Sequence, residues 1–293
     1  LQVFLLMVIV VIGGFLTIKS EYFLTPSNLI NIADSCGYRL IMAVGMTFIM
    51  ASGVMDLSAG STVSLAGVIT AWMLHAGAGI PLSVAAGLLT GIAAGVLNGM
   101  LRGISLIITG GRPITRFGAA FMTIGTGRLA GIQISVWIAV ILTLAAAVVL
   151  NCTRWGSYIR TLGSNPEALQ KCGIGIAGYR ISVQAVMGLA AAITAVIITA
   201  RLNSAEPNAG MDMELDAITA VAMGGTPITG GKSRISGTML AVIILGIIRN
   251  GLTLMSISSD YQQWITGFLL LVSVLVSGIR IKNTKQKYTR KGE

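Results

Sequence analysis

Long apolar runs separated by short polar segments dominate this chain. A helix needs about 20 mostly apolar residues to cross a bilayer, and most of the runs approach that length. The pattern therefore predicts an all-α, polytopic membrane protein, and Gly118–Leu150 is read as one span with a lead-in. The candidate spans are Leu1–Ile18, Leu29–Ala51, Leu57–Leu74, Pro81–Leu101, Gly118–Leu150, Ile181–Ala200, Ile235–Leu254 and Trp264–Ile279.

One apolar piece, Ala217–Met223, is too short to cross the full bilayer as a regular helix, and it follows an acidic segment. Proteins tolerate such a piece only where other parts of the protein cover it or where it lines a wet cavity. We therefore expect a half-helix or part of a broken span.

Composition agrees with lipid as the main surroundings. The chain is 54% hydrophobic and only 10% charged, whereas soluble domains carry about 25% charged residues. The net charge of +10 does not indicate nucleic acid as a partner, because the basic residues are not interleaved with aromatics on one soluble face. Six of them lie in Arg280–Lys291, so we interpret residues 280–293 as a basic cytoplasmic tail beside anionic membrane lipid. The chain opens on Leu1 inside an apolar run, and we expect its true start to precede Leu1.

Catalytic and metal sites are not predicted. The odd count of three cysteines, Cys36, Cys152 and Cys172, argues against a disulfide framework. His75 is the sole histidine and has no neighbour at metal-ligand spacing. The run Thr226–Ser233 resembles a phosphate-binding loop but has Thr226 where that motif needs glycine. No catalytic motif is readable, so an enzyme is not expected.

The polar segment Asn151–Arg180 has four basic residues and one acid. Its length and polarity place it outside the hydrocarbon, and its basic excess places it in the cytoplasm. Inside it, Asn165 precedes Pro166 and Glu167, a pattern that predicts the first turn of a short helix. We expect this helix to contact a soluble partner.

Counting spans backwards from the basic tail gives a topology. It places Asp260 outside, Lys232 and Arg234 inside, the acidic segment Arg201–Asp216 outside, and the Asn151–Arg180 loop inside. Three residues depart from this rule because the same count places their region outside or at its edge: Arg112, Arg116 and Arg128.

A glycine run at every fourth residue predicts close helix packing, because glycine lets a neighbouring backbone approach closely in lipid. It comprises Gly87, Gly91, Gly95, Gly99 and Gly103.

Charges within or beside the spans are costly in lipid and could be functional. Asp34 and Arg39 lie five apart on one helix and need not pair. Asp56 and Asp216 each precede an apolar run, where an acid can cap a helix. For both, a helix cap and a contact with a transported solute remain open.

Several motifs together resemble the monosaccharide permeases of the ribose-transporter type. They are the runs Ala43–Met50 and Gly53–Ser61, then Thr109–Ile114, Leu162–Ala168, and Glu214–Ile218 with Gly224–Thr226. Such permeases are membrane subunits of bacterial ATP-binding-cassette importers of the type II kind. The match follows nearly the whole chain in order.

The resemblance implies a single permease domain, residues 1–293, in the bacterial inner membrane, with about ten spans. It implies a homodimer with the sugar pathway between its copies, no catalytic residue and no cofactor in this chain. ATP and magnesium would belong to a cytoplasmic two-cassette ATPase, and a periplasmic or lipid-anchored binding protein would deliver the sugar. The loop 151–180 would hold the coupling helix to the ATPase, with Asn165, Pro166, Glu167, Ala168 and Leu169.

The solute, ribose or a related pentose or hexose, needs polar partners along its route. Candidates for this role are Asp56, Ser58, Ser61, Thr62, Ser64, Asp216 and Thr219. The chain departs from the family after Arg102, where a further apolar segment of one span's length is expected before Gly110. Either this protein lacks that segment, or its residues are absent from the sequence. We expect the latter, because the loss of one crossing would invert the orientation of everything before it.

Two alternatives to an ATP-driven importer remain at this point. An ion-coupled secondary transporter would need an ionisable group near the bilayer midplane, and Asp34 with Arg39 is the plausible pair. A membrane scaffold without transport is the other.

Overall fold

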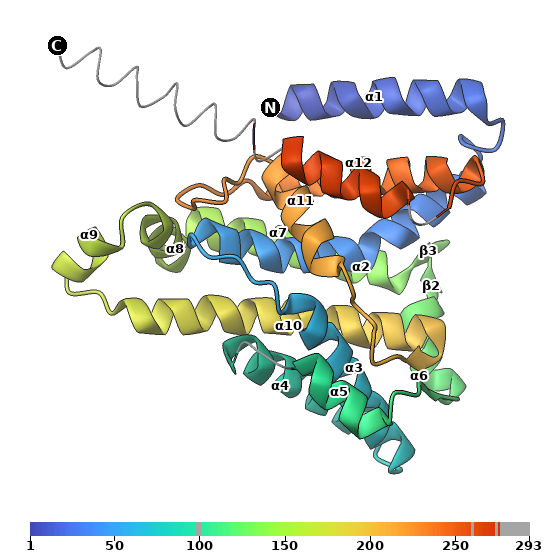
Figure 1. The fold of residues 1–293 in the computed structure, drawn as a ribbon, viewed down its shortest axis with the longest axis horizontal. Helices are drawn as coiled ribbons and strands as arrows, with labels where there is room; N and C mark the ends of the chain where they lie inside the picture. The colour runs from blue at the N-terminus through green and yellow to red at the C-terminus, as the bar shows by residue number, and fades with distance from the viewer. Residues whose placement is uncertain (98–100, 259–260, 273–274, 276–293) are drawn as a thin grey trace.

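Helices build the scaffold of the computed structural model, which describes residues 1–97, 101–258, 261–272 and 275 (Figure 1). The elements are α1 (Gln2–Lys19), α2 (Pro26–Ala51), α3 (Ala59–His75), α4 (Ile80–Leu97), α5 (Leu101–Thr109), β1 (Ile114–Thr115), α6 (Ala119–Thr126), β2 (Arg128–Leu129), β3 (Ile132–Gln133), α7 (Ile134–Cys152), α8 (Arg154–Ser164), α9 (Pro166–Lys171), α10 (Ile176–Leu202), β4 (Ser204–Ala205), α11 (Met213–Met223) and α12 (Ile235–Leu254). Residues 261–272 are also helical. Gly99, Asp260, the tail 280–293 and part of Trp264–Ile279 lie outside the described residues.

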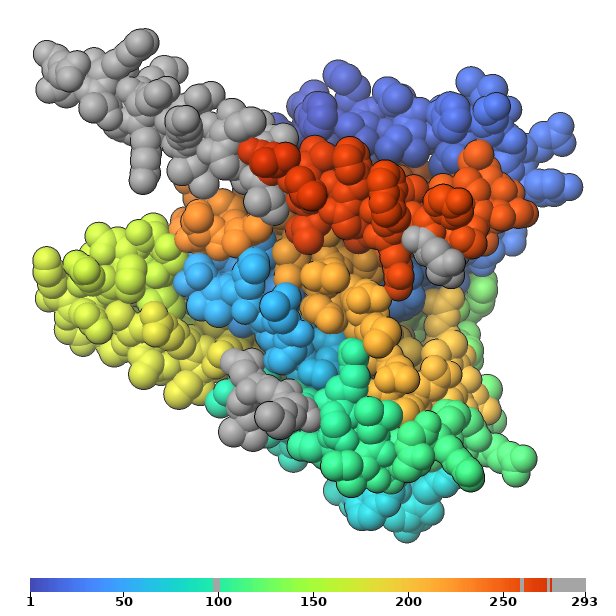
Figure 2. Space-filling view, in the orientation of Figure 1, coloured from blue at the N-terminus to red at the C-terminus, as the bar shows by residue number. Residues whose placement is uncertain are grey.

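Five helices of the described part are long and apolar enough to cross a membrane, namely α1, α2, α7, α10 and α12. They run roughly along one direction, with α8 and α9 at one end and the β2–β3 hairpin at the other (Figure 1). We call these the α9 end and the hairpin end. Figure 2 shows the segment of α8 and α9 projecting from the body of the molecule. The prediction of a helical, multi-pass membrane protein is confirmed.

The basic loop after α11 and the acidic segment after α10 lie at opposite ends of the molecule, as predicted by counting spans from the basic tail. At the α9 end, the N–H of Gly231 donates to the carbonyl of Ala51 over 3.0 Å, and a Cβ at Gly163 would meet these two residues. The loop with Lys232 and Arg234 therefore lies at the same end as α9. At the other end, β4 pairs antiparallel with β1. The acidic segment after α10 thus starts at the end opposite to the basic loop, as the count predicted.

Helix α2 is the centre of the core. From Leu40 to Ala51 every residue is buried by neighbouring helices, so this apolar stretch faces protein rather than lipid. It packs against α7, α10, α11 and α12. A Cβ at Gly45 would lie 2.7 Å from the Cβ of Ala190, so this glycine permits the close approach of α10.

The candidate span Pro81–Leu101 is divided. Helix α4 ends at Leu97, and a separate helix of 9 residues, α5, begins at Leu101. The glycine run is divided with it. Gly87 faces α3, and Gly95 faces α10, where a Cβ would lie 2.8 Å from the Cα of Gly188.

The far end of the glycine run does not pack in this way. Gly103 lies on α5, and a Cβ there would meet nothing within 4 Å. Gly91 shares the contact of Gly95 with α10. Among the described glycines of the run, Gly87, Gly91 and Gly95 on α4 therefore pack closely as expected, whereas Gly103 on α5 does not.

The short apolar piece Ala217–Met223 lies within α11, a helix of 11 residues. At 1.5 Å per residue it spans about 16 Å, which is about half of the hydrocarbon thickness. Residues 217–222 are all buried. The prediction of a half-helix covered by protein is confirmed.

Candidate functional site

A hollow of about 500 Å³ lies between α2, α10, α11, α12 and the helical residues that follow α12. Its walls mix polar and charged side chains with apolar ones such as Ile198, Leu202 and Met211. Its lining includes the aromatic ring of Tyr38, the amides of Asn208, Gln262 and Gln263, three arginines (Arg39, Arg201, Arg249) and two aspartates (Asp212, Asp216). Such a mixture of amides, charges and one aromatic ring can hydrogen-bond a polar solute.

The segment 203–212 brings α11 to the hollow from the hairpin end. Asn203 ends α10 in the left-handed region with φ of 51°, a conformation that asparagine tolerates. Its side chain accepts a hydrogen bond from the N–H of Phe117 over 2.9 Å. Asp212, with φ of 63°, is the N-cap of α11. These two turns lead the chain from the end of α10 to the start of α11, beside the hollow.

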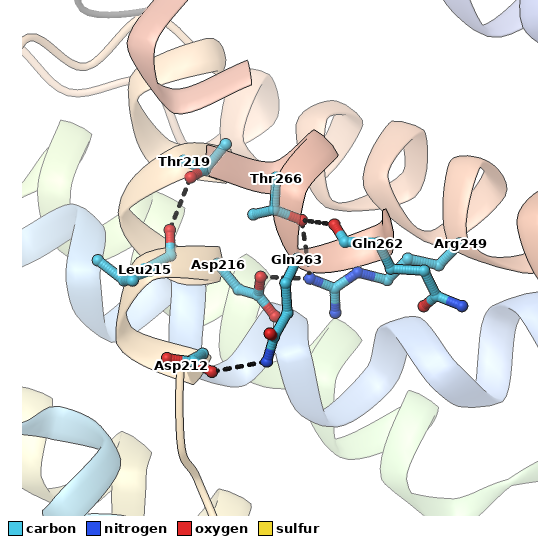
Figure 3. A network of polar contacts seen from close by, with 8 residues as sticks. All are labelled: Asp212, Leu215, Asp216, Thr219, Arg249, Gln262, Gln263 and Thr266. Atoms are coloured by element: carbon cyan, nitrogen blue, oxygen red, sulfur yellow. Dashed lines mark hydrogen bonds and ion pairs between the residues drawn. The ribbon is translucent and has the colours of Figure 1, made fainter. Parts of the chain in front are cut away.

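An ion pair crosses one side of the hollow. Arg249 on α12 pairs through Nη2 with Asp216 on α11, and the side chains are 16% and 18% exposed. The same Nη2 donates to the hydroxyl of Thr266 over 3.3 Å. Gln263 donates to Asp212 over 2.8 Å. Figure 3 shows that these contacts join three segments, α11, α12 and residues 262–266, around one guanidinium.

The position of Asp216 differs from one of the two roles expected for it, that of a helix cap before Ala217. Helix α11 begins at Met213, so Asp216 lies within the first turn and is not the cap that precedes Ala217. Its partner Arg249 is 33 residues away in sequence. The acid therefore lies in a position where it can contact a solute in the hollow.

Asp34 is buried and lies outside the hollow, near the hairpin end. Its carboxylate pairs with Arg128 over 3.5 Å and accepts from the N–H of Gln133 over 3.2 Å. Its backbone carbonyl accepts from Arg201 over 3.2 Å. Asp34 thus anchors the β2–β3 hairpin and does not pair with Arg39. This ion pair also gives Arg128 a partner. Arg128 is one of the three arginines that the charge count placed on the outer side, against the rule.

The remaining pathway candidates lie apart from the hollow, and several bond the backbone. Asp56 accepts from the N–H of Ser58 over 2.7 Å and from its hydroxyl over 2.6 Å, which is a local turn before α3. Ser64 donates to the carbonyl of Pro207 over 2.6 Å. The hydroxyls of three others donate to carbonyls of their own helix or its cap: Ser61, Thr62 and Thr219.

The predicted coupling segment forms α9. Asn165 caps the helix by accepting from the N–H of Ala168 over 3.1 Å, and Pro166 is its first residue. Asn165, Pro166 and Glu167 are exposed. Leu169 is buried, so it holds α9 to the protein and is not available on its surface. The local helix prediction is confirmed.

Helix α8 connects α9 to α2. Its buried residues Ile159 and Leu162 lie three apart, on one helix face. The ring of Trp155 lies 5.5 Å from that of Phe48 on α2. Helix α8 therefore lies between α9 and α2, the helix that carries Tyr38 and Arg39.

The other sequence motifs form local structure. The ring of His75 bonds the carbonyl of Thr115 over 2.8 Å. In the loop that resembled a phosphate site, Thr226 is buried and accepts from the N–H of Arg234 over 3.2 Å. Among the residues that the structure describes, no group of three metal-binding side chains occurs.

Sequence reasoning missed most of the hollow. Arg201, Asn208, Gln262 and Gln263 were not identified as site residues, because each is polar and lies near a helix end, where polar residues are common. Arg249 was also missed, although a guanidinium inside the apolar run Ile235–Leu254 was a usable signal.

The chain is similar to known proteins over most of its length. The family described as "Branched-chain amino acid transport system / permease component" matches residues 28–108 and 104–274. The two matched pieces meet at residues 104–108, next to Arg102, where the sequence departs from its expected pattern. No solved structure matches the chain.

Individual relatives are sugar permeases by name. The chain is 43% identical to the "Ribose import permease protein RbsC" of Haemophilus influenzae over 178 residues, which are 59% of this chain and 55% of the relative. It is 38% identical over 177 residues to the protein of the same name from Bacillus subtilis, covering 60% of this chain and 55% of the relative. It is 29% identical over 174 residues to the "L-arabinose transport system permease protein AraH" of Escherichia coli, covering 59% and 53%. The chain thus spans about half the length of the curated relatives it matches.

Proposed function

We propose, from the premise that this chain belongs to the branched-chain amino acid transport system permease component family, that it forms the pathway for a monosaccharide in an ATP-driven importer. As a permease component it is a multi-pass membrane protein and not an enzyme. The observation that carries the proposal is the polar hollow among its buried helices. We place the protein in the cytoplasmic membrane of a bacterium.

The chemistry of the hollow favours a polyhydroxylated solute over an apolar amino acid side chain. Its volume of about 500 Å³ is in the usual range for small-molecule sites. Side chains of Asn208, Gln262 and Asp212 supply both donors and acceptors. The names of the relatives, ribose and L-arabinose permeases, support a pentose or a related hexose.

The α9 end supports ATP-driven work by a separate subunit. The exposed Asn165, Pro166 and Glu167 form a small surface for the groove of a cytoplasmic two-cassette ATPase. Trp155 on α8 contacts Phe48 on α2, and α2 carries Arg39 to the hollow. In this way, ATP-dependent movement of α9 would change access to the hollow. Such coupling requires that the permease has two states and that these bind the ATPase with different affinity.

The remaining parts of the assembly are proposed on the family pattern. Two copies of the chain would form the pathway, and a periplasmic or lipid-anchored binding protein would deliver the sugar.

The family pattern has about ten spans. Helix α5 has 9 residues, about 14 Å of helix, so we propose that it is the remainder of an interrupted crossing. The natural protein should then contain about 20 more residues beside α5, which peptide mapping by mass spectrometry would detect.

Uptake by proteoliposomes tests the function. The protein is reconstituted alone, with a candidate two-cassette ATPase from the same bacterium, and with that ATPase and a candidate sugar-binding protein. Uptake of labelled D-ribose or L-arabinose is expected only with all components and ATP. Uptake by the chain alone, driven by a proton or sodium gradient, would support the ion-coupled alternative instead. That alternative has lost its expected pair, because Asp34 is bound to Arg128 and not to Arg39.

A further inference from the structure

The basic loop after α11, residues 226–234, lies against the segment that leads into α9. A Cβ built at Gly231 would lie 2.8 Å from the Cβ of Ser164, the residue directly before the cap Asn165. Figure 2 shows the orange segment after α11 beside the yellow-green segment of α8 and α9. The basic loop and the start of α9 therefore belong to one surface.

Three glycines from three segments permit this contact. Gly53 follows α2, Gly163 lies near the end of α8, and Gly230 lies in the basic loop. A Cβ at Gly230 would lie 2.6 Å from the Cα of Gly53 and 2.9 Å from the Cα of Gly163. Gly53 and Gly230 have φ of 80° and 79°, which glycine adopts without steric cost. The backbone of the basic loop is thus packed directly on the backbone before α9.

Hydrogen bonds hold the basic loop in one shape. The N–H of Gly231 donates to the carbonyl of Ala51 over 3.0 Å. The N–H of Arg234 donates to the buried hydroxyl oxygen of Thr226 over 3.2 Å. Lys232 lies between these two bonded points, and the side chains of Lys232 and Arg234 are exposed. The loop therefore presents two cations from a fixed turn.

The surface that the basic loop shares with α8 and α9 has an excess of positive charge. Residues 151–180 contain four bases and one acid, Glu167, and the basic loop adds two bases and no acid. The exposed bases are Arg154, Lys171, Arg180, Lys232 and Arg234. A partner that covers this surface must supply carboxylates or phosphates, because facing charges of like sign repel.

The position of the basic loop favours a protein as this partner. Residues 217–222 of α11, which precede the loop, are all buried, and Ala51 ends the buried half of α2. The loop therefore lies over the core of the chain and not over a helix that faces lipid. At its far end, Ser236 accepts from Gln2 of the exposed helix α1, so anionic headgroups are the competing partner for Arg234.

We propose that the basic loop is a second docking element for the cytoplasmic ATPase, and that it faces an acidic patch beside the groove that receives α9. The inference rests on the proposed function. Charges at the edge of an interface act mainly on the association rate and on its salt dependence. The basic loop would thus steer the ATPase toward the surface on which α9 fits.

Binding of a candidate two-cassette ATPase from the same bacterium to the permease in nanodiscs tests the surface without transport. The nanodiscs contain phosphatidylcholine only, so no anionic lipid occupies the loop. Lys232→Glu with Arg234→Glu should weaken binding about tenfold at about 50 mM salt, mainly through the association rate, and about twofold at about 500 mM. The control, Arg112→Glu with Arg116→Glu, makes the same change of net charge at the hairpin end and should bind as the unchanged protein does.

Two results would overturn the role of the basic loop. One is equal binding by the loop variant and the control. The other is a loss that occurs only in nanodiscs that also contain phosphatidylglycerol, because lipid headgroups would then be the partner of the loop. If the charge reversal prevents folding, Lys232→Gln with Arg234→Gln should still weaken binding about threefold at low salt.

A cross-link reports the position of the ATPase independently of charge. In a background with Cys36→Ala, Cys152→Ser and Cys172→Ser, the exposed Thr229→Cys in the basic loop carries a benzophenone maleimide. Illumination should join this probe to the bound ATPase, whereas the same probe at the exposed Thr115→Cys at the hairpin end should not react with it. A bound ATPase that forms no cross-link with Thr229→Cys would overturn the proposal.

Failure of the loop and failure of the proposed function give different results. If Glu167→Arg weakens ATPase binding and the loop variant does not, α9 alone docks the ATPase and only the basic loop is rejected. If the unchanged permease binds no ATPase in either lipid, the ATP-driven function is overturned as well. Binding and cross-linking without ATP-driven sugar uptake would overturn the sugar pathway and leave the docking surface standing.

Discussion

The contact of α4 with α10 yields a quantitative prediction at Gly95. A methyl group built there would lie 2.6 Å from the carbonyl oxygen of Gln184 and 2.8 Å from the Cα of Gly188. Both atoms belong to the backbone of α10, so they cannot turn aside as the end of a flexible side chain could. Gly95→Ala must therefore push the two helices apart.

The magnitude follows from two opposing terms. Overpacking of this kind costs about 1–3 kcal/mol, and alanine regains about 0.5–1 kcal/mol over glycine in a helix. We expect Gly95→Ala to lower the free energy of unfolding by about 1 kcal/mol, within a range of about 0–2.5 kcal/mol. The matched control is Gly103→Ala, from the same sequence run, because a Cβ there meets nothing within 4 Å. It should be neutral or stabilising by up to about 1 kcal/mol.

Reversible unfolding in mixed detergent micelles, followed by helical circular dichroism, measures the two variants against the unchanged protein. The unfolding midpoints of Gly95→Ala and Gly103→Ala should lie below and above that of the unchanged protein, respectively, or the free energies of unfolding of the two variants should differ by about 2 kcal/mol. If Gly95→Ala proved as stable as Gly103→Ala, the close approach of α4 and α10 would be refuted, and with it the role of this glycine in packing.

Three further substitutions test the two ends of the molecule. Asn165→Ala removes the cap of α9 and should destabilise this helix by about 0.5–2 kcal/mol, seen as faster hydrogen exchange in residues 166–171 with the global midpoint unchanged; unchanged exchange would contradict the cap. Glu167→Arg places a cation at the positive end of the α9 dipole and should abolish ATP-driven uptake in proteoliposomes without loss of folding; retained uptake would count against the coupling role. Asp34→Ala removes the contacts with Arg128 and Gln133 and should cost about 1–3 kcal/mol, with faster proteolysis of the β2–β3 hairpin; a hairpin as resistant as before would show that Asp34 does not hold it.

Several elements of the fold could be predicted because their causes are local. The cap Asn165, the proline after it and the acid in the first turn specify α9 within three consecutive residues. The long apolar runs specify α1, α7 and α12 because lipid requires about 20 apolar residues whatever the neighbours are. The short length of Ala217–Met223 was enough to predict a covered half-helix, because an incomplete span cannot face lipid.

The interrupted crossing shows where local signals fail. The run Pro81–Leu101 is apolar throughout, so hydropathy predicts one span, yet α4 ends at Leu97 and α5 starts anew. The glycine period continues across this break to Gly103, although only the part on α4 meets α10. Periodicity measures spacing along one helix, and it has no information on where that helix ends.

The sequence by itself determined the class of protein, the lipid surroundings and the helix that projects at the α9 end, because each depends on composition or on neighbours within one or two turns. Only the tertiary structure decided that Asp216 meets Arg249, that Asp34 holds Arg128 rather than Arg39, and that three arginines surround one hollow. The physical reason is that charge pairing in a helical bundle depends on the rotation and depth of separate helices. Those are set by packing over the whole chain, and no short stretch of sequence specifies them.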